Sequence, residues 1–199
     1  MRYKVGKTEV INPSINSPEW DKAQEGQIAH QRWKEFYQPI NTTFKILRGP
    51  EGISVLMHTD EKNLVCTKTK ENDRVCMDSC MEFFLKPDPL DGRYINFEFN
   101  PKGVMNSSIG TGRNDRIFNE HNREIFKIES IPNDGDWTLK FYIPDSFIME
   151  NYERIASICK GNFYKCGEGT DHSHFIVWSE VEVPEPDYHI PDFFGTLEF

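Results

Sequence analysis

The sequence predicts an all-β protein: a single antiparallel β-sandwich, jelly-roll-like, with few short helices. Three observations lead to this fold class. Several short segments alternate between apolar and polar residues, which is the pattern of strands with one buried face. Clusters of Gly, Pro, Asn and Asp separate these segments and indicate tight turns. No helical segments alternate with the strands, as a parallel sheet would require.

Four strands are expected in the first half of the chain. Residues 42–48 and 53–58 flank the sequence Gly49-Pro50-Glu51-Gly52, and this arrangement predicts a hairpin. A third strand is expected at 80–86, where two prolines follow it closely. The fourth spans 94–100 and ends at a Pro-Lys-Gly sequence.

The strand at 94–100 alternates most clearly, and successive side chains of a strand point to opposite faces of its sheet. The residues expected to face the core are Ile95, Phe97 and Phe99. The residues expected to face water are Tyr94, Asn96, Glu98 and Asn100. This strand should therefore present one polar, solvated face.

The second half of the chain continues the same pattern. Strands at 124–131 and 137–143 are expected to pair around the turn sequence Asn133-Asp134-Gly135. A short helix should begin at Pro144-Asp145-Ser146 and end near Tyr152. The last strands are predicted at 162–166, 175–179 and 195–199.

Length and charge restrict the class of protein. The 199 residues fit one domain, 1–199, in which 1–19 form an N-terminal extension of that domain. The net charge of −9 disfavours nucleic acid and anionic membranes as partners. No apolar stretch is long enough for a signal sequence or a membrane span, so we expect a cytoplasmic location unless a signal was removed upstream.

The five cysteines are expected to be free thiols, because their number is odd and a reducing cytosol disfavours disulfides. Cys76 and Cys80, together with His172 and His174, form a weak zinc pattern. Cysteines in strands are more often small buried apolar residues, and a single Cys-x3-Cys lacks a matching second pair. The sequence therefore leaves the metal content open.

The residues carry no motif of a known catalytic class, which favours binding over catalysis. A sugar ring needs one aromatic side chain against its apolar face and polar groups around its hydroxyls. The polar face of 94–100 and the sequence Pro186-Asp187-Tyr188-His189 offer these residue types. Two alternatives stay open: a glycoside hydrolase that uses Glu82 and Glu98, and a structural or interaction domain without sugar binding.

Four strings of residues, in order along the chain, resemble the family 9 carbohydrate-binding modules, especially the standalone bacterial family 9-like proteins. The first is Asp78-Ser79-Cys80-Met81-Glu82-Phe83-Phe84-Leu85, and the second runs from Tyr94 to Gly103 and continues to Gly112-Arg113. The third is Gly161-Asn162-Phe163-Tyr164-Lys165-Cys166-Gly167, which leads to His174 and Trp178. The last runs from Pro186 to Leu197.

This resemblance implies a β-sandwich that binds glucan- or xylan-type oligosaccharides or chain ends without catalysing a reaction. It implies that Tyr188 stacks on the sugar ring in place of a clamp tryptophan, and that Glu82 and Asn96 contact hydroxyls. From their position we add Glu98 as a hydroxyl contact, Arg113 as an outer donor and His189 at the rim. The candidate set is completed by Asn162, Lys165 and Trp178. The second clamp tryptophan would fall near Cys76, where this chain departs from the pattern.

The resemblance also implies structural calcium and action beside a catalytic domain. Calcium needs about six or more oxygen ligands. The acidic candidates are Asp60, Glu61, Asp73, Asp78 and Asp134. Because this chain has no room for a catalytic domain, three alternatives stay open: a short intracellular oligosaccharide as ligand, a separate glycoside hydrolase as partner, or another ligand altogether.

Overall fold

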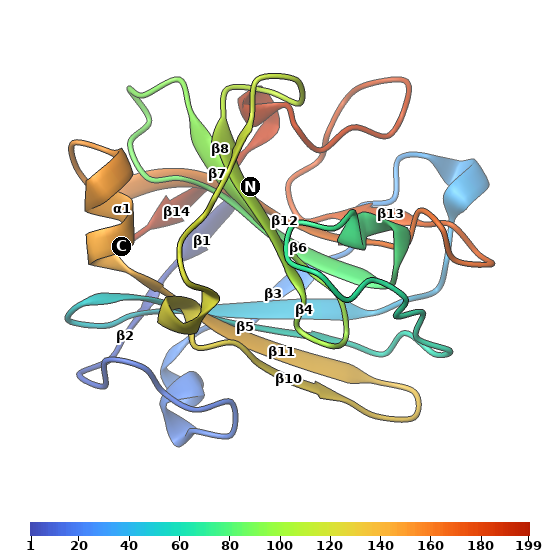
Figure 1. Cartoon of the computed structure of the whole chain (residues 1–199), viewed down its shortest axis with the longest axis horizontal. Helices are drawn as coiled ribbons and strands as arrows, with labels where there is room; N and C mark the ends of the chain where they lie inside the picture. Colours follow the sequence, from blue (N-terminus) through green and yellow to red (C-terminus); the bar gives the residue numbers. More distant parts are fainter.

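The computed structural model describes all residues from 1 to 199 and shows two packed β-sheets (Figure 1). The larger sheet has the strand order β1-β14-β12-β6-β7-β8-β9, and β13 pairs with β12. Its strands are β1 (Arg2–Lys4), β6 (Cys80–Lys86), β7 (Tyr94–Phe99), β8 (Met105–Gly110), β9 (Ile117–Phe118), β12 (Ile158–Cys166), β13 (Phe175–Val177) and β14 (Gly195–Glu198).

The smaller sheet has the order β10-β11-β5-β4-β2, and β3 pairs with β4. Its strands are β2 (Gly6–Lys7), β3 (Gly26–Ile28), β4 (Thr42–Arg48), β5 (Gly52–Thr59), β10 (Glu129–Pro132) and β11 (Trp137–Pro144). The only α-helix is α1 (Asp145–Asn151); short 3-10 turns occur at η1 (Pro18–Lys22), η2 (Lys34–Phe36), η3 (Val75–Met77), η4 (Arg123–Phe126) and η5 (Pro191–Phe193). This architecture confirms the predicted β-sandwich with few short helices.

Two features of the sheets differ from the prediction. The sheets are mixed, because β1 runs parallel to β14 and β2 runs parallel to β4. Both parallel pairs are made by the N-terminal strands, which join a sheet edge from a distant part of the chain (Figure 1). The predicted strand at 124–131 begins later, since residues 123–126 form η4 and only Glu129–Pro132 pair with β11.

The main core lies between the two sheets and is rich in aromatic rings. Phe163 of β12 stacks on Phe44 of β4 at a centroid distance of 3.7 Å and on Phe83 of β6 at 4.4 Å. Ile95, Phe97 and Phe99 also face this core, as the alternation predicted. Close packing makes such rings a large part of the stabilising contact area.

A second apolar cluster covers the outer face of the larger sheet. Phe84 of β6, Tyr94 of β7 and Tyr164 of β12 belong to it, and loop residues such as Trp33 and Tyr188 pack over them. The predicted solvated face of β7 is therefore wrong: Tyr94, Asn96, Glu98 and Asn100 are all buried. Loops cover this face, so both faces of the larger sheet are interior.

None of the helices is long and apolar enough to cross a membrane.

Candidate functional site

A small polar cavity lies over the outer face of β6, β7 and β8, where the covering loops leave a gap. Its volume is about 90 Å³. Three arginines and three glutamates are among the lining residues, so the wall carries both donors and acceptors. The lining residues are Arg74, Cys76, Glu82, Glu98, Asn106, Arg113, Arg116, Glu168, Tyr188 and His189.

The carboxyl groups of Glu82 and Glu98 lie side by side on the wall of this cavity. The two residues are directly opposite in the antiparallel β6–β7 pair, so their side chains leave the sheet in the same direction. Their exposed fractions are only 2% and 5%. Burial, together with the charge of Glu98, raises the pKa of the Glu82 carboxyl well above its usual range. Burial also raises the pKa of Glu98, to about 7, against an opposing effect of Arg116.

Asn96 positions Glu98 from behind the cavity wall. The Asn96 side-chain amide donates to Glu98 Oε1 at 2.8 Å, and the Ser108 hydroxyl donates to Asn96 Oδ1. Arg116 lies 3.6 Å from the same Glu98 oxygen and also lines the cavity. Asn96 is fully buried and does not line the cavity. It therefore orients Glu98 from outside the lining, whereas the sequence predicted that Asn96 contacts a sugar hydroxyl directly.

The side-chain oxygen of Asn106 in β8 has no hydrogen-bond partner. Its side-chain amide nitrogen donates to the backbone oxygens of Asn72 and Asp73, and these contacts fix the orientation of the group. The opposite atom, Oδ1, is buried and has no hydrogen-bond partner. A buried acceptor without a partner costs about 1–3 kcal/mol. A hydroxyl group bound in the cavity would remove that cost.

Tyr188 and His189 close one side of the cavity. The Tyr188 ring stacks on Tyr164 at a centroid distance of 4.1 Å and is 6% exposed. One face of this ring is therefore occupied by the protein, which leaves an edge for a ligand and not a broad stacking surface. His189 Nδ1 and the Tyr94 hydroxyl share a hydrogen bond of 2.7 Å. Burial lowers the pKa of His189 to about 3, so its imidazole is neutral.

Charged side chains form the rim. Arg113 donates to Asp187 at 2.8 Å, and both side chains are partly exposed. Arg74 and Glu168 are 3.8 Å apart on another part of the rim. Cys76 lines the cavity at the place where the resemblance would put a tryptophan. Hydrogen-bonding groups thus dominate the rim, and an aromatic clamp is absent.

Three predicted site residues lie elsewhere. Asn162 is fully buried and joins β12 to Ser179, accepting from its backbone nitrogen and donating to its backbone oxygen. Trp178 packs in the main core against Phe44 and Tyr3. Lys165 points from β12 to the other face of the sheet, where it pairs with Glu61 at 2.8 Å. None of the three lines the polar cavity.

The sequence reasoning missed Arg74, Asn106, Arg116 and Glu168. Asn106 is the cross-strand partner of Glu98, and Arg116 follows three residues after the predicted Arg113. The alternation of β8, Met105-Asn106-Ser107-Ser108, would have placed Asn106 on the same face as Glu98 had the β7–β8 pairing been known. The two loop residues Arg74 and Glu168 reach the cavity through the tertiary fold, which no local sequence pattern predicts.

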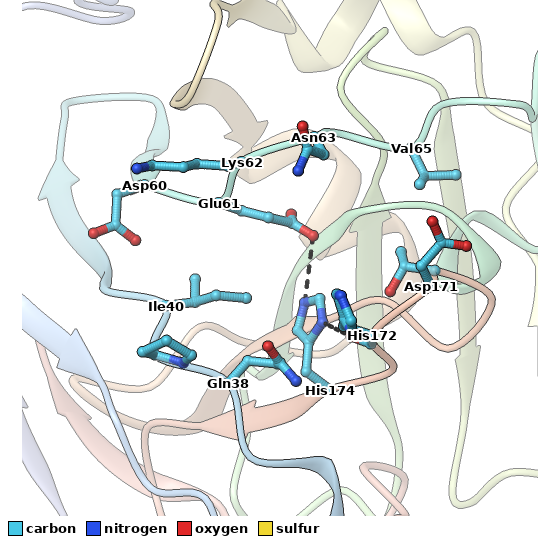
Figure 2. Close-up of a pocket in the computed structure, with 12 residues that line it drawn as sticks. Gln38, Ile40, Asp60, Glu61, Lys62, Asn63, Val65, Asp171, His172 and His174 are labelled. Carbon is cyan, nitrogen blue, oxygen red and sulfur yellow. Dashed lines mark hydrogen bonds and ion pairs between the residues drawn. The ribbon is translucent and has the colours of Figure 1, made fainter.

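A larger cavity of about 490 Å³ has a different lining, which includes Glu61, His172 and His174 (Figure 2). Figure 2 shows the His174 ring pointing toward Glu61. Lys165 donates to His174 Nε2 at 2.8 Å, and burial together with this ammonium lowers the pKa of His174 to about 3. His174 is therefore neutral, and the ion pair of this cluster is the one between Lys165 and Glu61.

The metal candidates from the sequence do not assemble. At only one place do three ligand atoms of His, Cys, Asp or Glu approach within 4.8 Å of one another, and none of the proposed calcium ligands belongs to it. Asp78, for example, is engaged by Thr67, Lys68 and Asn100. These carboxylates do not fit a calcium site of about six oxygens. The zinc pattern of Cys76 and Cys80 with His172 and His174 does not form either.

Comparison with known proteins gives a consistent family. The sequence matches the model of "Carbohydrate-binding family 9" over residues 19–199. No curated protein matches the chain. A candidate carbohydrate-binding protein from Bacteroides uniformis ATCC 8492 is similar in structure, with a TM-score of 0.89 and 26% identity over 100% of this chain and 98% of the other.

Two solved structures of a family 9 module from Caldicellulosiruptor kristjanssonii have the same fold. The glucose complex has a TM-score of 0.70 and 10% identity, and covers 100% of this chain and 95% of the other. The cellotriose complex has a TM-score of 0.68 and 11% identity, and covers 100% and 93%. At these identities the likeness concerns the fold alone. The match over residues 19–199 decides the family, and this chain belongs to carbohydrate-binding family 9.

Proposed function

We propose that the protein binds a glucan- or xylan-type oligosaccharide, without catalysis, in the polar cavity over β6, β7 and β8. This proposal rests on Asn106 Oδ1, the buried acceptor without a hydrogen-bond partner, because a sugar hydroxyl could donate a hydrogen bond to it. The mixed arginine and glutamate wall supports it further. Such a wall has donors and acceptors in similar number, which suits a neutral ligand with many hydroxyls.

The small volume of the cavity favours a chain end. A space of about 90 Å³, partly closed by the Arg113–Asp187 pair, accepts part of one terminal ring and gives no passage for a continuous chain. The Tyr188 edge offers the apolar contact. Glucose and cellotriose are the natural first ligands to test, since they occupy the related modules from Caldicellulosiruptor kristjanssonii.

No observation favours hydrolysis. Glu82 and Glu98 project in parallel from adjacent strands and share one wall, whereas a glycosidase places its two carboxyls on opposite sides of the scissile bond. A separate glycoside hydrolase as a partner stays a prediction of the sequence.

Calorimetric titration with glucose and with cello-, xylo- and manno-oligosaccharides tests the proposal. Arg113→Ala removes a charged donor worth about 1.5–3 kcal/mol, so affinity should fall by about 10- to 150-fold. Asn106→Ala removes the unpaired acceptor Oδ1 and should weaken sugar binding less than Arg113→Ala does. The control is Arg154→Ala, which breaks a comparable surface pair with Asp88 away from the cavity. Absence of heat with every sugar, or equal affinity in all variants, would reject this site.

A further inference from the structure

Two cysteines and a glutamate meet on the outer face of the larger sheet. Cys80 of β6 and Cys166 of β12 are directly opposite in the antiparallel pair, so both sulfur atoms project from the same face. Glu82 lies two residues after Cys80 and shares that face. The two sulfurs and a carboxylate oxygen lie within 4.8 Å of one another, the only such group of potential metal ligands in the protein.

The distances between these atoms are close to those around a tetrahedral metal ion. Cys166 Sγ lies 3.0 Å from Glu82 Oε1, and Cys80 Sγ lies 3.7 Å from the same oxygen. Bonds of about 2.3 Å to sulfur and about 2.0–2.2 Å to oxygen separate neighbouring ligand atoms by roughly 3.5–3.8 Å. The Cys80 sulfur-to-oxygen distance lies in this range, and that of Cys166 would have to lengthen by roughly half an ångström.

The chemistry of the ligands selects the kind of ion. Two sulfurs and one carboxylate suit zinc and similar thiophilic cations, whereas calcium and magnesium require oxygen ligands throughout. In the protein without metal, both thiols donate their protons toward Glu82 Oε1. Binding of the cation releases the thiol protons to solvent, and the metal takes the place of the two hydrogen bonds. Burial raises the pKa of the Cys80 thiol to about 12 against an opposing effect of the Lys165 ammonium, so the thiol is protonated in the protein without metal.

The cluster is connected to solvent through the polar cavity. Cys80, Glu82 and Cys166 are 0%, 2% and 0% exposed, yet Glu82 lines the cavity together with Cys76. Because Glu82 belongs both to the cluster and to the cavity wall, the cavity is the route by which a cation would reach the cluster. We propose that Cys80, Cys166 and Glu82 bind a thiophilic divalent cation of the zinc class, with the fourth coordination position open to the cavity.

Cobalt(II) titration of the full chain, reduced and then freed of metal by a chelator, tests this site. One equivalent of cobalt should produce a thiolate-to-metal charge-transfer absorption that zinc abolishes. Cys80→Ser and Cys166→Ser should each lower the affinity at least tenfold. The matched control is Cys159→Ser, because Cys159 is equally buried but hydrogen-bonded to backbone oxygens of Pro87 and Ala156. It should bind cobalt like the wild type.

A second variant and a second measurement cover the case in which the serine variants do not fold. Glu82→Gln keeps the size of the side chain and removes its charge, so zinc should bind more weakly to a chain with an unchanged circular dichroism spectrum. X-ray absorption of the zinc form should show two sulfur ligands. No charge-transfer band, a band that survives both serine substitutions, or a zinc shell without sulfur would overturn the proposal. These readouts are independent of sugar binding.

Discussion

Replacing Glu98 by glutamine tests how strongly burial acts on the carboxyl pair of the cavity. Glu98 is 5% exposed, accepts a hydrogen bond from Asn96 and lies 3.6 Å from Arg116. Burial raises the pKa of Glu98 from 4.5 to about 7, so the Arg116 charge does not compensate the loss of water. Glutamine has the shape of the protonated acid, and Glu98→Gln therefore imitates the neutral form at every pH.

The expected magnitude follows from linkage between protonation and folding. The folded chain holds the Glu98 proton more tightly than the unfolded chain, so this contribution is complete below pH 4.5 and is lost as the pH rises through 7. The shift of about 2.5 pKa units corresponds to about 3 kcal/mol at 1.36 kcal/mol per unit. For a chain of this length, each kcal/mol changes the Tm by roughly 2–4 °C.

Thermal unfolding between pH 4.5 and pH 8, in the presence of a chelator, provides the measurement. The variant should match the wild type near pH 4.5 and exceed its Tm by about 6–12 °C at pH 8. Glu180→Gln, which removes an exposed glutamate, controls for the change in net charge and should give a Tm difference that is independent of pH. A Tm difference for Glu98→Gln that is likewise independent of pH would refute the reasoning, because Glu98 would then be ionised in both the folded and the unfolded chain.

Three further predictions concern stability and are measured by chemical denaturation. Phe163→Ala should cost about 3–5 kcal/mol, because this ring stacks between two others in the core, whereas the same change at the exposed Phe118 should have little effect. Asn162→Ala should lower the free energy of unfolding by about 1–3 kcal/mol and leave sugar affinity unchanged, since its side chain is hydrogen-bonded to backbone groups and does not line the cavity. Lys165→Met should cost about 3–5 kcal/mol by leaving Glu61 buried without its partner, and adding Glu61→Gln should restore part of that loss.

The fold was largely predictable because local patterns carry it. The hairpin of β4 and β5, the core face of β7 and the short helix α1 all follow from alternation and turn residues close in sequence. The parallel pairings of β1 and β2 were not predictable in this way. Each joins segments far apart along the chain, Arg2–Lys4 with residues 196–198 for example, and no period in either segment specifies its neighbour.

The site was predictable only in part, for a related reason. Glu82, Glu98, Arg113 and His189 line one cavity, and they stand in the strings that resemble the family. Lys165 was grouped with them by proximity in sequence, but the strand period sends it to the opposite face from Tyr164 and Cys166. The strand period separates the two faces, but it does not tell which of them carries the cavity when loops bury both.

The burial of both faces explains why polar residues gather at one point. Loops that pack on the outer face of the larger sheet exclude water from Glu82, Glu98 and Asn106, which are polar groups on otherwise apolar strands. Leaving an acceptor unpaired and a carboxyl pair unsolvated costs several kcal/mol, which an apolar residue at any of these positions would avoid. Elsewhere on this face, Asn100 and Asp78 are fully hydrogen-bonded to their surroundings. Glu82, Glu98 and Asn106 thus lie together where a cavity opens, and a ligand with hydroxyl groups, or a cation at the thiol pair beside them, would make their burial favourable.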